Sequence, residues 1–277
     1  MRRRQFPAIV GIVNVTPDSF SDGGRYVEPD RAIAHALELI AAGADMLDIG
    51  GESSRPGSDR VPEVEEIRRV VPVIDGIRRV NAAIPISIDT TKAAVARAAL
   101  DHGATMINDI SAGRFDPAMF PLAAERNVPI VLMHMQGTPK TMQENPHYLD
   151  VVEEVFAFLQ ERIESARAHG VQHIIADVGI GFGKTVEHNL KLLAHLDRFA
   201  ALGVPLLLGV SRKRFLGAIT GIEQPSDRDQ ATALMHALLV DAPIEYIRVH
   251  NVALHAQLRT LWHALTDVES LRSRVHA

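Results

Sequence analysis

The residues of this 277-residue chain that could carry out chemistry gather directly behind its apolar segments. The densest group, NVTPDSFSDGG at 14–24, follows the apolar run 8–13 and holds two Asp, two Ser, one Thr and one Asn. A stretch this polar between a buried strand and a helix rarely serves packing alone. Carboxylates, amides and cations follow the later apolar runs as well, which indicates an enzyme with a site for an anion. These later groups are GGESSRPG at 50–57, DTTK at 89–92, ND at 108–109, HMQG at 134–137, D at 177 with GIGFGK at 179–184, SRKR at 211–214 and RVHN at 248–251.

Eight short, nearly continuous apolar runs predict parallel strands buried on both faces. They are residues 8–13, 45–49, 84–88, 105–108, 129–134, 173–176, 205–210 and 245–249. Amphipathic stretches between them predict helices at 30–42, 63–80, 92–101, 117–125, 149–169, 187–200, 227–240 and 253–265. Gly43, Gly103, Gly170 and Gly203 each stand between a helical stretch and the next strand, where a left-handed helix C-cap belongs.

The unbroken alternation of strand and helix predicts an α/β fold, a single (β/α)8 TIM barrel with its active site at the C-terminal ends of the strands. An open doubly wound sheet is the competing architecture, but the residues behind Gly11 form no GxGxxG turn. Barrels of this kind reach this length as one unit, and no low-complexity tract divides the chain. We therefore expect one domain over 1–277, with the barrel at about 8–265 and tails at 1–6 and 266–277.

Composition narrows the class of protein and its compartment. The net charge of −5 gives no electrostatic reason to expect nucleic acid as a partner. No apolar run approaches the ~20 residues that span a bilayer, and we interpret the Arg run at 2–4 as a solvated terminus rather than a targeting signal. The chain has no cysteine, which excludes disulfides, thiolate metal sites and a cysteine nucleophile and makes the cytoplasm the expected location.

The motifs at the strand ends resemble those of the dihydropteroate synthases, a family of folate biosynthesis. The resemblance rests on NVTPDSFSDGG, GGESSRPG, SIDTTK, INDIS, LMHMQG, GIGFGK, GVSRKRFLG and RVHNV, in this order. It covers nearly the whole chain, and all eight motifs fall at one mouth of the predicted barrel. It implies a transferase that condenses 6-hydroxymethyl-7,8-dihydropterin diphosphate with 4-aminobenzoate, giving 7,8-dihydropteroate and diphosphate.

The resemblance implies a pterin subsite built from several strand ends. A reduced pterin presents a row of donors, so a specific pocket needs carboxylates and amides in fixed positions, a donor for the ring acceptors and apolar walls. Taken alone, Asp89 could instead cap the helix predicted near Lys92. The side chains expected at the ring are Asp89, Asn108, Met133, Asp177, Phe182 and Lys213.

The resemblance also implies a diphosphate clamp made of Asn14, Arg55, Arg248 and His250. Mg²⁺ is the expected cofactor, with Asn14 as its direct protein ligand, because this ion binds phosphate oxygens and keeps several waters. Strand alternation places Arg248 and His250 on one face of the last strand. Two alternatives stay open: His250 as a buried structural imidazole, and Arg248 as an ion-pair partner of Asp177 or Asp89.

The implied mechanism is dissociative: diphosphate leaves, a cation forms at the exocyclic methylene of the pterin, and the arylamine attacks it. Asp22 is expected to stabilise the cation and Phe20 to close the pocket, although Asp18 and Asp22 could equally be turn residues. With Lys213, Arg248 and His250 they make up the expected catalytic set. The side chains expected to bind aminobenzoate are Ser54, Arg55, Pro56, Phe182, Lys213 and Arg214, together with the amides that open the helix after Arg214.

Three positions depart from the family pattern. Val178 stands where Pro is usual, Asn251 where Asp is usual, and Arg214 where Ser is frequent. Val178 loosens the backbone beside Asp177. Arg214 adds a cation near the expected carboxylate site, so the sequence leaves open whether this is a sulfonamide-insensitive member of the family.

The sequence leaves two alternative functions open and also predicts an oligomeric state. A pterin-binding methyltransferase of the same superfamily would use Asp89, Asn108 and Asp177 but would need no diphosphate clamp, and a non-catalytic barrel would form no product. The late helices are more apolar than packing on a barrel requires, which favours a homodimer through them. The residues concerned are Ala233, Leu234, Ala237, Leu238, Val240, Leu258, Leu261 and Trp262.

Overall fold

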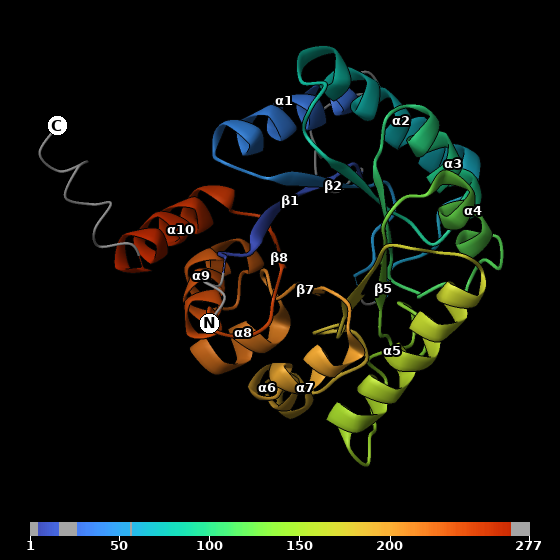
Figure 1. Cartoon of the computed structure of the whole chain (residues 1–277). Coiled ribbons are helices and arrows are strands. Elements are labelled where there is room, and N and C mark those ends of the chain that lie inside the picture. Colours follow the sequence, from blue (N-terminus) through green and yellow to red (C-terminus); the bar gives the residue numbers. More distant parts are fainter. Residues whose placement is uncertain (1–4, 17–26, 56, 267–277) are drawn as a thin grey trace, which may run out of the picture.

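A computed structural model describes residues 5–16, 27–55 and 57–266 of the chain. Its strands are parallel and close into one barrel in chain order, with helices around the outside (Figure 1). This confirms the predicted TIM barrel, and the ends of each strand lie within two residues of their predicted positions. The strands are β1 (Ala8–Asn14), β2 (Met46–Gly50), β3 (Ile86–Asp89), β4 (Met106–Asp109), β5 (Ile130–Met133), β6 (Ile174–Asp177), β7 (Leu206–Leu208) and β8 (Tyr246–Val249).

The helices follow the predicted alternation with three differences. The stretch 187–200 is interrupted at His195, whose φ of −124° and ψ of 32° lie outside helical values. The stretch 227–240 begins as a 3-10 turn, and a further short helix, α8, precedes it. The four predicted capping glycines all have positive φ. The elements are α1 (Val27–Ala41), α2 (Glu63–Val80), α3 (Ala93–Asp101), α4 (Met119–Arg126), α5 (Val151–Ala168), α6 (Val186–Ala194), α7 (Leu196–Phe199), η2 (Ala200–Leu202), α8 (Arg214–Thr220), η3 (Pro225–Arg228), α9 (Asp229–Leu238) and α10 (Val252–Thr266).

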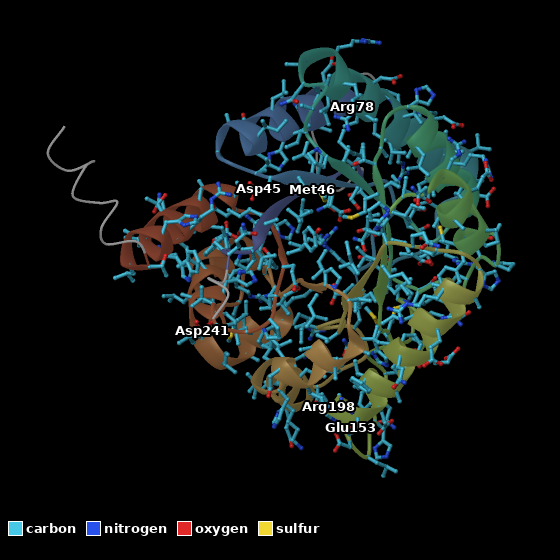
Figure 2. All side chains as sticks on the ribbon, in the orientation of Figure 1. Asp45, Met46, Arg78, Glu153, Arg198 and Asp241 are labelled. Carbon is cyan, nitrogen blue, oxygen red and sulfur yellow. The ribbon has the colours of Figure 1, made fainter. Side chains whose placement is uncertain are left out.

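Side chains that point outward from the barrel join the main hydrophobic core beneath the helices. In β8, for example, Ile247 and Val249 are buried in that core, whereas Arg248 between them points inward. Ion pairs lie on the outer surface of the helices, and Figure 2 shows one of them, between Arg198 and Glu153, outside the ring of strands. Among the described residues, no helix is both long and apolar enough to cross a membrane.

Inward-pointing side chains form two layers of different character. The lower layer is apolar and fills the barrel with residues from six strands: Met46, Met106, Val131, Ile175, Leu207 and Tyr246. Two residues further along four of the same strands stand Asp48, Asn108, Asp177 and Arg248. Because side chains repeat every two residues along a strand, these polar groups form an upper layer at the C-terminal mouth of the barrel.

Candidate active site

A charged cluster occupies the upper layer of the barrel. Arg248 donates from Nε to Asp48 Oδ2 at 2.5 Å and from Nη2 to Asp89 Oδ2 at 2.8 Å. Asn108 Nδ2 donates to the same Asp48 oxygen at 3.1 Å. Strand register also aligns Asp89 with Asn108, so three sequence-predicted residues meet here. Asp89 is therefore an ion-pair partner of Arg248, and the helix-cap interpretation of this residue is wrong because the N-cap of α3 is Lys92.

The electrostatics of this cluster favour a ligand with hydrogen-bond donors. Asp48 is 1% exposed, and its Oδ1 atom has no hydrogen-bond partner among the described residues. Burial raises the pKa of Asp89, although Arg248 pulls it down. A buried carboxylate with an unused oxygen gains more from an added donor than an exposed one does.

Asp177 stands at the end of β6, beside Met133 of β5 in the sheet register. Its Oδ1 atom accepts the Gly179 N–H at 2.7 Å, and burial raises its pKa. Gly179 has a φ of 69°, and a Cβ atom there would lie 1.8 Å from the His134 carbonyl oxygen. Only glycine therefore allows this turn, which fixes the backbone beside Asp177 even though Val178 has replaced the usual proline.

Lys184 holds the glycine-rich loop that follows β6. Its buried Nζ donates to the carbonyl oxygens of Gly179 at 2.9 Å and Phe182 at 3.0 Å, and to His134 Nδ1 at 2.9 Å. Burial lowers the pKa of Lys184 to about 7. This lysine was not among the predicted site residues, and its hydrogen bonds hold the backbone carbonyl groups of Gly179 and Phe182.

Phe182 and Lys213 form one wall of the mouth. The Lys213 Nζ atom lies 4.0 Å from the centre of the Phe182 ring. Burial and the nearby Arg248 lower the pKa of Lys213 to about 8, against the pull of Asp177. Phe182 belongs to a small apolar cluster with Met133, and this cluster gives a flat ring an apolar surface to lie on. The other members of the cluster are Ile110, Met135 and Met142, with Phe115 packed against them.

His250 is held by Ser211, in the loop that follows β7. The Ser211 Oγ accepts the His250 backbone N–H at 3.1 Å and lies 2.9 Å from Nδ1. Burial and the cations Arg212 and Arg248 lower the pKa of His250 to about 3, so its ring is neutral at pH 7. Since Ser211 engages Nδ1, Nε2 is the nitrogen that can bind a ligand.

The loop after β2 forms one side of a cavity of about 650 Å³ that is also lined by Asp89. Glu52 anchors this loop because Lys92 Nζ donates to it at 2.8 Å and to the buried Glu66 at 2.5 Å. Residues 53 and 54 line the same cavity. The cavity is also lined by Ser58, Asp59, Arg60, Thr90, Thr91, Ile110, Arg114, Phe115, Thr138, Pro139 and Lys140.

The remaining predicted residues are half-buried, exposed, or outside the part of the chain that the structure describes. Asn14 is half-buried at the end of β1, paired in register with Gly50. Arg55 and Arg214 are exposed. Phe20, Asp22 and Pro56 lie outside the described residues. The described part of the chain contains no group of three or more His, Asp or Glu side chains that could hold a metal ion.

Asp48 is the main site residue that sequence reasoning missed. It lies inside a strand rather than behind it, and the signal was an acidic residue within the apolar run 45–49. Its inward direction follows from Met46, which is part of the apolar layer two residues earlier. Ser211 was also missed as the partner of His250.

The site geometry agrees with similarity to known proteins. Residues 10–250 match the family described as pterin binding enzyme. The dihydropteroate synthase of Synechocystis sp. is 44% identical over 252 residues, which are 90% of this chain and 87% of that protein. The Xanthomonas albilineans dihydropteroate synthase with 4-aminobenzoic acid superposes with a TM-score of 0.88 at 48% identity, covering 94% of this chain and 93% of the other. The same enzyme in complex with 7,8-dihydropteroate gives 0.84 at 45%, covering 94% of each chain. The chain belongs to the pterin-binding enzyme family.

Proposed function

We propose that this chain is a dihydropteroate synthase that joins 6-hydroxymethyl-7,8-dihydropterin diphosphate to 4-aminobenzoate and releases diphosphate. One structural observation supports this most directly. Asp89, Asn108, Asp177 and Lys213 come from four different strand ends and share one mouth of the barrel beside the apolar Phe182 cluster. Relatives crystallised with 4-aminobenzoic acid and with 7,8-dihydropteroate share this fold over nearly the whole chain.

The pterin ring would lie on the apolar cluster of Phe182 and Met133. Asp177 and Asp89 would accept from its donor edge, Asn108 would hydrogen-bond beside them, and Lys213 would donate to ring acceptors. Asp48 extends this set, because its carboxylate fixes Asn108 through a hydrogen bond.

Arg248 would contact both the buried carboxylates and the diphosphate. It neutralises Asp48 and Asp89, and its remaining N–H groups would face the diphosphate together with Arg55 and His250. Mg²⁺ would be held by the half-buried Asn14 and by phosphate oxygens. A single amide ligand suits this ion, which keeps several of its waters. When bound, it would neutralise charge that develops on the leaving diphosphate.

The aminobenzoate would enter beside Phe182 and Lys213, with its carboxylate toward the exposed cations Arg55 and Arg214. Ser54 and Pro56 are the other proposed contacts. The additional charge of Arg214 should change affinity for sulfonamides, which present a related anionic group; comparing sulfonamide inhibition of wild type and Arg214→Ser tests this directly.

For the chemical step we propose diphosphate departure before amine attack, with Asp22 stabilising the pterin cation and Phe20 closing the pocket. Asp22→Ala should slow the chemical step by a factor on the order of 10² or more and leave pterin diphosphate binding nearly unchanged. Rapid-quench single turnovers at saturating aminobenzoate measure this step. A change of less than about twofold would remove Asp22 from this role.

The reaction itself is tested by incubating the purified chain with pterin diphosphate and radiolabelled 4-aminobenzoate. Labelled dihydropteroate and one equivalent of diphosphate are expected. A methyltransferase or a non-catalytic barrel would release no diphosphate under these conditions.

We further propose a cytoplasmic homodimer. Leu234 and Leu238 lie one turn apart on α9 and are 67% and 80% exposed, and Leu261 and Leu265 repeat this on α10 at 63% and 80%. The two helices are neighbours (Figure 1), so these side chains would make one apolar surface that a second copy could cover. Sedimentation equilibrium should give a dimer that Leu238→Glu dissociates; a monomeric wild type at micromolar concentration would contradict it.

A further inference from the structure

Two loops of the candidate site are joined through the first residue of α9. The loop after β7 supplies Ser211 and Lys213, and the loop after β8 supplies His250. Between Ser211 and Lys213 stands Arg212, whose φ of 59° is left-handed. A residue with a Cβ atom keeps this conformation only when its surroundings hold it there.

Arg212 is held by α9 and by the turn that precedes it. Its Nε and Nη2 atoms donate to Asp229 at 2.6 and 2.8 Å as a two-pronged ion pair. Its backbone N–H donates to Thr232 Oγ1 at 3.1 Å, and its carbonyl oxygen accepts from Arg228 at 3.1 Å. These contacts orient the residues on either side of Arg212 toward the mouth of the barrel.

The same Asp229 carboxylate also holds the second loop. Asn251, directly after His250, donates from Nδ2 to Asp229 Oδ2 at 3.2 Å. The Asn251 Oδ1 atom accepts the Leu254 N–H at 3.1 Å and so caps α10. The Asp229 carboxylate therefore joins the Lys213 loop to the His250 loop on the side of α9. A second contact, between Ser211 and His250, joins the same two loops.

We infer that Asp229 is a positioning residue for the transfer reaction, acting through Arg212 on Lys213 and through Asn251 on His250. In the pattern that the sequence resembles, an acidic residue is usual at position 251; here the carboxylate stands at 229 and an amide at 251. The Asn251 amide suits this arrangement, because a second carboxylate would place two negative oxygens against each other. The inference rests on the proposed function.

Asp229→Asn should lower kcat and weaken inhibition by inorganic diphosphate. The turnover loss should be on the order of 10², since a displacement of about 1 Å in catalytic groups has an effect of that size. Asp227→Asn is the matched control: Asp227 is exposed and lies two residues away, and among the described residues its side chain hydrogen-bonds only its neighbour Ser226. Melting temperatures, recorded for every variant, separate misfolding from misplacement.

A charge swap gives the sharper test. Asn251→Asp alone keeps the α10 cap but sets two carboxylates against each other, and it should lower kcat by about tenfold. In the Asp229→Asn background the same change should raise kcat, because positions 229 and 251 again hold one amide donor and one carboxylate acceptor. Such a reversal of sign in kcat, at temperatures where all variants are folded, supports the inference.

Two results would overturn the inference: Asp229→Asn turning over within twofold of Asp227→Asn, or Asn251→Asp having the same sign of effect in both backgrounds. If Asp229→Asn does not fold, Asn251→Asp in the wild-type background decides alone, since an unchanged kcat and diphosphate inhibition constant would also overturn it. An inactive wild type would instead contradict the proposed function.

Discussion

The two inner layers of the barrel are built by the same strands yet differ in almost every physical property. In β6, Ile175 packs in the lower layer, and Asp177, two residues later, lies in the upper one. In β2 the corresponding residues are Met46 and Asp48, and in β8 they are Tyr246 and Arg248. A single two-residue step thus separates packing from binding, which shows how a barrel can hold a charged site directly on its own core.

The layers also differ in what they contribute to folding. The lower layer buries apolar side chains and stabilises the protein. The upper layer buries charges: burial raises the pKa of Asp89 and Asp177, and Asp48 Oδ1 has no partner among the described residues. Such groups destabilise an empty site, and a ligand that supplies donors would reverse that cost.

Of the changes proposed in the upper layer, removal of Arg248 should lower the stability of the protein the most. Arg248→Ala leaves Asp48 and Asp89 buried without their cation and should lower the free energy of unfolding by about 3–5 kcal/mol at pH 8. The loss should be smaller at pH 5. Without Arg248, the pKa of Asp89 in the folded state lies further above its unfolded value, so the folded state takes up a proton as pH falls and gains stability.

Urea denaturation of wild type and Arg248→Ala at pH 5 and pH 8 measures this difference. Arg97→Ala, which breaks the exposed pair with Glu125, is the control and should show no comparable loss at either pH. An equal loss for Arg248→Ala at both pH values would show that the buried carboxylates are not its cause.

Asp177→Asn should separate binding from stability in the same layer. The amide keeps an oxygen for the Gly179 N–H but presents a donor where the pterin also donates, which should weaken pterin binding by ~3 kcal/mol. Because burial already disfavours the charged form of Asp177, the neutral amide should not lower the melting temperature. Calorimetry with pterin diphosphate and a thermal scan of each protein measure the two effects; unchanged affinity would reject the assigned contact.

The sequence predicted the fold well because parallel strands buried on both faces appear as apolar runs, and all eight runs became strands. The break at His195 could not be seen, since Leu192, Leu193, Leu196 and Phe199 keep helical spacing across it and all are buried. Backbone geometry at one residue, rather than the apolar pattern, ends that helix.

The site was predictable only as far as strand ends are. Asp89, Asn108 and Asp177 lie at or near the last residues of their strands and were predicted in this way. The ion pair of Arg248 with Asp89 joins residues 159 positions apart, and the one with Asp48 joins residues 200 apart. Only strand register brings such residues together, so the sequence could offer the Asp89 pairing as an alternative and could not find Asp48.

A small change in the lower layer should affect stability and nothing else. Ile175→Val removes one methylene from a buried side chain and should lower the free energy of unfolding by about 1 kcal/mol. Both Michaelis constants should stay at their wild-type values, because the upper layer rests on the backbone of β6 rather than on this side chain. Steady-state kinetics and urea denaturation test both statements, and a raised Michaelis constant for the pterin diphosphate would show that the layers are coupled.

Titration of Lys213 should change pterin affinity and protein stability in opposite directions as the pH rises. Burial lowers its pKa to about 8, so its cationic form is lost as pH rises past that value. Between pH 8 and pH 9 the protonated fraction falls roughly fivefold, and pterin affinity that depends on a donated Lys213 proton should fall with it.

The free energy of unfolding should change in the opposite direction to the pterin affinity. The pKa of Lys213 is lower in the folded state than in the unfolded state, so the unfolded chain binds more protons between about pH 8 and 10, and this lysine makes folding more favourable as pH rises through that window. Lys213→Met removes both dependences and is the control. Pterin binding and urea denaturation at half-unit steps from pH 7 to 10 measure the two slopes; parallel slopes for wild type and Lys213→Met would show that another group titrates there.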